Sequence, residues 1–189
     1  MKKLLIFCAV AVLTIGTVGI AAANVLTFED LSGSGPMPSP YDEIVSFEPG
    51  VWSYWNAAPP YTPSSGVEVV YADAGELHPS WSFLTPVFYS GSYFSGYDFA
   101  TVQMDLYLGG TLVYSTGTFV PSGTPTFFAT NYSGLVDKVV INNPDPSYCV
   151  MDDLTYTTPA VPIPGAAWLL GFGLLRLANY RRRKLAASS

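Results

Sequence analysis

The sequence contains little positive charge, histidine or cysteine. Its 189 residues include 8 Lys and Arg against 14 Asp and Glu, one His and 2 Cys. Cys8 lies in an apolar N-terminal segment, so Cys149 would be the only cysteine of an exported chain and could form no intrachain disulfide. One His and one Cys cannot supply a zinc site, and no Gly-x-Ser-x-Gly motif is present. The sequence therefore predicts a protein that is not an enzyme, and a small hydrolase using His78 or a carboxylate pair is the alternative.

The charges are distributed very unevenly along the chain. All acidic residues lie between Glu29 and Asp153, and Lys138 is the only basic residue in that span, which gives it a net charge of −13. The other basic residues lie near the two ends. Because so acidic a domain would repel phosphates, the pattern excludes nucleic acid as a partner. It favours cations or neutral partners such as sugars.

The middle of the chain lacks any long helical period. Short runs bounded by Gly or Pro predict strands instead, most clearly a hairpin over 101–119. There Val102, Met104 and Leu106 alternate with polar residues before a Gly109–Gly110 turn. Further strands are predicted over 25–28, 43–47, 51–55, 67–71, 126–129, 138–141 and 149–157. Nine or ten short strands predict an all-β domain over 24–158, a β-sandwich of the jelly-roll type.

Residues 1–23 have the pattern of a secretory signal peptide. Lys2 and Lys3 precede an apolar run over 4–20, and Ala21–Ala23 supplies the small residues that signal peptidase accepts. Cleavage would leave Asn24 as the new N-terminus. The apolar run is long for a signal peptide, so an uncleaved N-terminal helix in the membrane is the alternative.

Residues 159–184 form a second targeting segment, which is followed by a tail over 185–189. Its parts are a Pro-rich motif of Val161, Pro162, Ile163, Pro164 and Gly165, an apolar transmembrane helix beginning near Trp168, and a basic cluster of Arg181, Arg182 and Arg183. The prolines favour an extended peptide, and the basic cluster keeps the C-terminus cytoplasmic. The stretch 166–178 would span roughly 20 Å, less than the roughly 30 Å core of a bilayer, which favours a temporary anchor.

This tail resembles the PEP-CTERM sorting signals, and among them the VPLPA-CTERM variant most closely. Ile163 stands where that pattern has Leu, Gly165 where it has Ala, and Arg176 where a small or apolar residue is usual. The resemblance implies recognition by an exosortase, a membrane cysteine transpeptidase. The enzyme would cut near the Pro-rich motif and release or re-attach the domain outside the inner membrane of a Gram-negative bacterium. An ordinary single-span anchor is the alternative.

The ends of the middle domain carry a second resemblance. Thr27–Leu31 and Val150–Tyr156 resemble the first and last strands of carbohydrate-binding-module-like jelly rolls, in which these strands lie near each other. The resemblance implies that Glu29 and Asp30 lie close to Asp152 and Asp153. Because Ca²⁺ takes six to eight oxygen ligands, we predict a structural calcium site there. The alternative is that these carboxylates are solvated strand ends.

The aromatic residues suggest how such a domain would bind a ligand. Sugar-binding surfaces use aromatic rings as platforms, and we predict Trp52, Trp55 and Trp81 as binding residues. Trp52 and Trp55 cannot point the same way on a regular strand, so at least one should be exposed. Further aromatic residues lie in Pro-, Gly- and Ser-rich stretches, namely Tyr61, Trp81, Tyr89, Tyr93 and Tyr97. Core packing is the alternative for each ring. The sequence thus predicts a sorted cell-surface or extracellular protein that binds exopolysaccharide, or a purely structural surface or biofilm protein with no specific ligand.

Overall fold

The computed structural model describes residues 22–73, 75–143 and 148–160, together with Gly171, Gly173 and Arg176. The chain divides into two compact units, one of Ala21–Pro159 and one of Met1–Ile20 with Ala160–Ser189. Gly171, Gly173 and Arg176 are helical and exposed. Among the described residues, no helix has the length and apolar character needed to cross a membrane. The predicted signal peptide before residue 22, the motif 161–165, Trp168 and the basic cluster lie outside the described residues.

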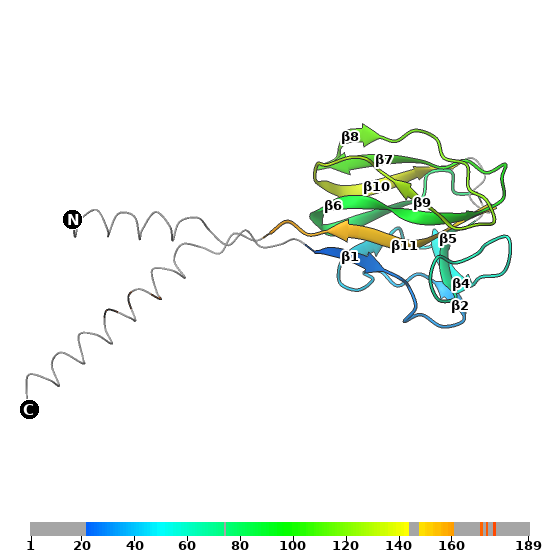
Figure 1. Cartoon of the computed structure of the whole chain (residues 1–189), viewed down its shortest axis with the longest axis horizontal. Helices are drawn as coiled ribbons and strands as arrows, with labels where there is room; N and C mark the ends of the chain where they lie inside the picture. Colours follow the sequence, from blue (N-terminus) through cyan, green and yellow to red (C-terminus); the bar gives the residue numbers. More distant parts are fainter. Residues whose placement is uncertain are drawn as a thin grey trace, which may run out of the picture. The chain divides into compact units, whose positions relative to one another are not determined.

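The unit Ala21–Pro159 is all-β, as the sequence predicts (Figure 1). Its described residues form eleven strands, which are β1 (Ala23–Leu26), β2 (Ser34–Pro36), β3 (Val45–Phe47), β4 (Trp52–Asn56), β5 (Glu68–Ala72), β6 (Ser80–Gly96), β7 (Gln103–Leu108), β8 (Thr111–Ser115), β9 (Thr126–Ala129), β10 (Val136–Asn142) and β11 (Cys149–Thr157). The predicted hairpin is confirmed as β7 and β8. Both turn glycines have positive φ, 59° at Gly109 and 78° at Gly110, as a type I′ turn requires.

The strands form two antiparallel sheets that are joined by the long strand β6. Sheet A has the order β2-β4-β5-β11-β6-β9, and β1 also pairs with β11; sheet B has the order β3-β6-β10-β7-β8. The first half of β6 pairs in sheet B up to Val87, and the second half pairs in sheet A from Phe88. Pro86, which has no N–H to donate to a ladder, immediately precedes this change of sheet. The two layers form a β-sandwich.

The core between the sheets is rich in aromatic rings. Trp81 on β6 is 1% exposed and Trp52 on β4 is 4% exposed. Their ring centroids are 5.6 Å apart, and Phe47 lies 5.6 Å from Trp52. The Trp52 indole N–H donates a 2.9 Å hydrogen bond to the Ser80 carbonyl. Trp52 and Trp81 are therefore core residues, and their predicted role in ligand binding is wrong because their rings face the opposite sheet and not the solvent.

Two glycines allow neighbouring strands to approach β6 closely. Gly91 has a φ of 142°, and a Cβ atom there would overlap the Phe128 carbonyl oxygen of β9. Gly96 has a φ of 152°, and its Cβ atom would overlap the Tyr148 carbonyl oxygen. In both cases the obstacle is backbone, which cannot rotate away as a side chain can.

Gly91→Ala is therefore expected to lower the free energy of unfolding by about 2 to 4 kcal/mol, because it adds steric overlap and an unfavourable φ. Urea denaturation of the two proteins measures the difference. Gly117→Ala is the matched control, since a Cβ atom there meets nothing within 4 Å. Equal stability of the two variants would show that β9 does not pack this closely on β6.

Candidate functional site

The outer face of sheet A carries the side chains that alternate with the core residues of β4 and β5. Trp52 points into the core, so Trp55, three residues on, points outward and pairs with Val69 on β5. On β11, Met151 is a core residue opposite Val70, so its neighbour Val150 lies on the outer face beside Tyr71. Val69 and Val150 are buried although they are outside the main core cluster. Something other than the opposite sheet must therefore cover them.

The aromatic side chains around Val150 belong to a connected row of rings, which we call the aromatic strip. It consists of Trp55, Tyr61, Tyr71, Tyr97, Phe99 and Tyr148. Neighbouring rings are in contact along the row, with centroid distances between 4.9 Å and 6.5 Å. Tyr97 is 39% exposed, Phe99 57% and Tyr148 40%. Six adjoining aromatic rings at a surface are more than isolated exposed apolar residues, and such patches mark binding sites.

A surface pocket of about 220 Å³ lies at one end of this strip. It is lined by Trp55, Tyr61, Tyr71 and Val150. Tyr61 lies 5.9 Å from Trp55 with the rings inclined at 67°, and Tyr71 lies 6.5 Å from Trp55 at 74°. The pocket is below the usual range of drug-sized sites, so it suits one small group of a ligand whose remainder extends along the strip.

The loop between β4 and β5 (57–67) provides Tyr61, and we call it the pocket loop. Asp152 on β11 holds it: Asp152 Oδ2 accepts hydrogen bonds from the backbone N–H groups of Ser64 at 2.7 Å and Ser65 at 3.0 Å. Asp152 Oδ1 accepts a third from the Asp153 N–H at 2.7 Å. The Ser65 hydroxyl donates to Asp153 Oδ1 at 2.8 Å. Two carboxylates of one strand thus fix the middle of the pocket loop.

The two ends of the tethered stretch are fixed as well. The Ser95 hydroxyl of β6 donates a 2.6 Å hydrogen bond to the Thr62 carbonyl, next to Tyr61. Glu29 accepts hydrogen bonds from the backbone N–H groups of Val67 and Glu68 at 3.0 to 3.2 Å. These bonds join residues 33 to 39 positions apart in the sequence, so the pocket wall is held by tertiary contacts.

The four predicted calcium ligands thus have protein partners. Glu29, Asp152 and Asp153 all bind the pocket loop, whereas Asp30 accepts a hydrogen bond from the Tyr41 hydroxyl. In the part of the chain that the structure describes, no group of three or more His, Cys, Asp or Glu side chains is arranged to hold a metal ion. Three of these carboxylates bind the same loop, and calcium binding there stays a prediction.

Burial raises the pKa of Asp152 to about 7, against the opposing effect of the backbone hydrogen bonds from Ser65, Asp153 and Ser64. A carboxyl group whose pKa is raised in the folded protein keeps its proton at pH values at which the same group in the unfolded chain has already released it. Its contribution to stability is therefore present at pH 4 and is lost as the pH rises to about 7.

The free energy of unfolding is accordingly expected to fall between pH 4 and pH 7, with a contribution from Asp152 of at most about 1.4 kcal/mol per pH unit. Urea denaturation in chelator at several pH values measures this slope. Burial also raises the pKa of Glu68, which likewise makes the stability fall as the pH rises. The slope of the wild type is therefore compared with that of Asp152→Asn, in which Glu68 is unchanged. A variant with the same slope as the wild type would show that Asp152 does not titrate in this range.

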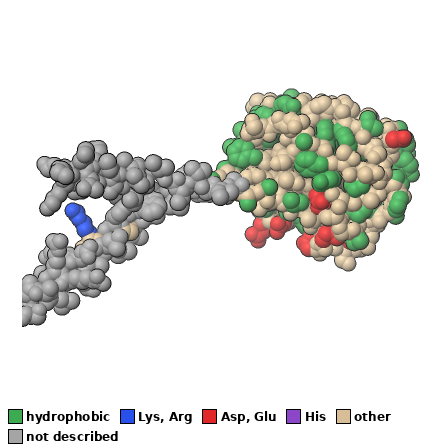
Figure 2. Space-filling model, in the orientation of Figure 1, with side chains coloured by type: hydrophobic (Ala, Val, Ile, Leu, Met, Phe, Trp, Pro, Cys, Tyr) green, Lys and Arg blue, Asp and Glu red, His purple; other side chains and the backbone are tan. Residues whose placement is uncertain are grey.

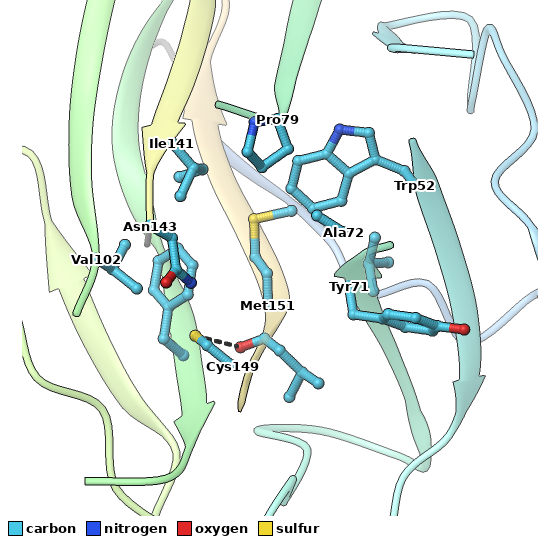
Figure 3. A pocket seen from close by; sticks show the side chains of 12 residues that line it. Trp52, Tyr71, Ala72, Pro79, Val102, Ile141, Asn143, Cys149 and Met151 are labelled. Atoms are coloured by element: carbon cyan, nitrogen blue, oxygen red, sulfur yellow. Dashed lines mark hydrogen bonds between the residues drawn. The ribbon is translucent and has the colours of Figure 1, made fainter. Parts of the chain in front are cut away.

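A second, smaller cavity of about 20 Å³ lies inside the sandwich (Figure 3). Trp52, Met151, Ile141 and Val102 are among the residues around it. Its volume allows about one water molecule. The Cys149 thiol contacts the Val150 carbonyl at 3.7 Å, and burial raises the pKa of the thiol well above its usual range. This cavity therefore suits neither a ligand nor thiolate chemistry.

His78, the residue considered for hydrolysis, is exposed beside β10. Its Nδ1 atom lies 2.8 Å from Asn142 Oδ1, and Asn142 Nδ2 donates a 2.8 Å hydrogen bond to Asp105 Oδ2. The Ser115 hydroxyl donates to Asp105 Oδ1 at 2.5 Å. Among these bonds none brings a hydroxyl to the imidazole, so the arrangement differs from that of a serine nucleophile activated by histidine.

Comparison with protein-family models gave no match, and comparison with curated proteins gave none either. Among solved structures, the chain is similar to a mutant of CBM29-2, a family 29 carbohydrate binding module studied for its ligand recognition. The identity is 11%, the alignment covers 72% of this chain and 92% of that chain, and the TM-score is 0.40. So distant a likeness identifies no ligand for this chain.

Proposed function

We propose that residues 24–158 form the non-catalytic ectodomain of an exported surface protein, a β-sandwich of the jelly-roll type that binds polysaccharide. The observation that carries this proposal is the aromatic strip with its pocket at Trp55, Tyr61 and Tyr71. Aromatic rings pack against the apolar C–H faces of sugars, while polar groups around them supply hydrogen bonds. Several rings in a row suit a chain of sugars better than a single sugar.

Polar groups suited to that purpose flank the strip. Tyr71 lies on β5, and Asp73 lies just beyond the end of this strand on the same outer side of sheet A. The Asp73 carboxylate accepts hydrogen bonds from the Ser53 hydroxyl at 3.2 and 3.4 Å. Asp98 lies between Tyr97 and Phe99 and is exposed. Carboxylates can accept hydrogen bonds from sugar hydroxyls. The strip thus combines apolar platforms with acceptors at its edges.

The two ends of the chain supply the proposed route to the cell surface. Signal peptidase would remove residues 1–23. The apolar helix would then hold the protein in the inner membrane until an exosortase-type transpeptidase acts near Pro162 to Gly165. The support is the order of motif, apolar stretch and basic cluster in the sequence. Intact mass of the protein from hosts with and without the sorting enzyme tests this route; a tail retained in both would contradict it.

Binding is tested by applying the full-length protein to a glycan array that includes bacterial exopolysaccharides. Trp55→Ala is expected to reduce binding at least about tenfold, because one buried ring–sugar contact is removed from the pocket. Tyr107→Ala on β7 is the matched control, since this ring lies in sheet B opposite Lys138. Self-association of the wild type without response to any glycan would favour the structural surface protein instead.

Calcium binding belongs to the same proposal as a structural element. If Glu29, Asp152 and Asp153 bind the ion as predicted, millimolar Ca²⁺ is expected to raise the melting temperature relative to chelator, because a ligand that binds only the folded state stabilises it. Asp30→Asn tests the fourth residue separately, since Asp30 faces Tyr41. An unchanged melting temperature would contradict the predicted site.

A further inference from the structure

The pocket at the end of the aromatic strip has the form of an aromatic cage. Trp55 forms one wall, and the rings of Tyr61 and Tyr71 stand at 67° and 74° to it. All three rings are half-buried, so they remain accessible to a ligand. The faces of aromatic rings carry negative electrostatic potential, and several rings around one space attract a cation, most strongly when one of them is Trp.

The charges of the domain support a cationic ligand in this place. Lys138, the only Lys or Arg between Glu29 and Asp153, lies on β10 of sheet B, where it is exposed. The outer face of sheet A carries Asp73 next to Tyr71 instead. Figure 2 shows Asp and Glu side chains, and no Lys or Arg, among the described residues on the visible face of this unit. An anionic group would be repelled here, and a cation would be attracted.

The walls of the pocket are fixed before any ligand binds. Trp55 and Tyr71 lie on adjacent strands whose register pairs Trp55 with Val69 and Ser53 with Tyr71. Tyr61 is fixed by the pocket loop, whose Thr62 carbonyl accepts the Ser95 hydrogen bond and whose Ser64 and Ser65 amides bind Asp152. A preformed cage loses little conformational entropy when it binds.

We propose that the Trp55–Tyr61–Tyr71 pocket binds a positively charged ammonium group, carried by an amino sugar of the polysaccharide. The inference rests on the proposed function, and it adds a chemical class to the ligand: a polysaccharide with free amines rather than one with only acetylated amines or with carboxylates. The ammonium group occupies the cage, and the rest of the sugar chain lies along Tyr97, Phe99 and Tyr148.

The cage is tested first with a pair of small probes of the same shape. Choline carries a permanent positive charge, and 3,3-dimethylbutan-1-ol is its uncharged analogue. Titration calorimetry of the full-length protein is expected to show choline binding at least about fivefold more tightly than the alcohol. Trp55→Phe should weaken choline binding, and Tyr71→Leu, which keeps an apolar side chain of moderate size, should weaken it too. Equal affinity for both probes would overturn the proposal.

The source of the ammonium group is tested with oligosaccharides that differ in charge. The protein is titrated with oligomers of glucosamine, N-acetylglucosamine and galacturonate at mildly acidic pH, and with phosphatidylcholine vesicles. We expect the glucosamine oligomer to bind at least about fivefold more tightly than its acetylated form, with an advantage that salt reduces.

The outcomes separate the inference from the function on which it rests. If the acetylated or acidic oligomers bind as tightly as the glucosamine oligomer, the domain binds sugars but the ammonium proposal is wrong. If the vesicles bind and no sugar does, the cage takes a lipid headgroup, and both the amino sugar and the polysaccharide function are wrong. Unchanged melting temperatures of Trp55→Phe and Tyr71→Leu show that a loss of binding does not come from unfolding.

Discussion

Trp81→Ala is expected to lower the free energy of unfolding by about 3 to 5 kcal/mol, the usual cost of removing a large aromatic side chain from a core. The ring of Trp81 lies 5.6 Å from that of Trp52, 6.4 Å from Phe47 and 6.0 Å from Tyr89. These residues come from β3, β4 and β6, so the cavity would open where both sheets meet. Urea denaturation of the variant and the wild type measures the loss.

Two further substitutions separate core packing from ring chemistry. Trp81→Phe should cost less than Trp81→Ala, because it keeps most of the apolar surface and removes an indole N–H that is buried with no hydrogen-bond partner among the described residues. Trp55→Ala should cost clearly less than Trp81→Ala, because Trp55 is only half-buried on the outer face. Equal losses at Trp55 and Trp81 would contradict the assignment of the two rings to opposite faces of the sandwich.

Asp152→Ala is expected to release the pocket loop. The substitution leaves the amides of Ser64, Ser65 and Asp153 without their acceptor, and unsatisfied polar groups of this kind cost about 1 to 3 kcal/mol each when they stay buried. Because the loop can move and expose the amides to water, we expect a total loss of about 2 to 4 kcal/mol. Hydrogen exchange at the Ser64 and Ser65 amides should become much faster.

The same substitution should weaken ligand binding although Asp152 does not line the pocket, because Tyr61 loses its fixed position. Asp137→Ala is the matched control, because half-buried Asp137 accepts one 2.7 Å hydrogen bond, from the Gly109 N–H at the β7–β8 turn, and this bond is exposed to water. Its loss should change stability by less than about 1 kcal/mol. Unchanged amide exchange in Asp152→Ala would show that other contacts hold the loop.

Local patterns were sufficient to predict much of the fold. The β7–β8 hairpin follows from the alternation of Val102, Met104 and Leu106 and from two glycines, since both signals act within a few residues. Strand β6, the longest, was missed. Its sequence contains Pro86, Gly91 and Gly96, which usually end strands, and here they serve the change of sheet and the close approach of neighbouring strands.

The orientation of the two tryptophans of β4 was predicted in part. Alternation on β4 correctly required Trp52 and Trp55 to point to opposite faces, but it could not tell which one faces the core. The Pro-, Gly- and Ser-rich stretches contain Tyr61 and Tyr97 but also Trp81 and Tyr89, which are buried, so this signal did not single out the strip. The tethering of the pocket loop by Asp152 could not be predicted, because its hydrogen bonds to Ser64 and Ser65 join residues that are 88 and 87 positions apart.

The central claim is that ligand binds at the outer face of sheet A, and the indole N–H signals in NMR spectra test it most directly. The chain has four tryptophans, of which Trp52 and Trp81 are buried and Trp55 lines the pocket. Substitution of single tryptophans assigns the four signals, and the full-length protein is then titrated with the glucosamine oligomer. We expect the Trp55 signal to shift in a saturable manner while those of Trp52 and Trp81 stay in place. Saturable binding that leaves the Trp55 signal unchanged would place the ligand elsewhere and contradict the proposed site.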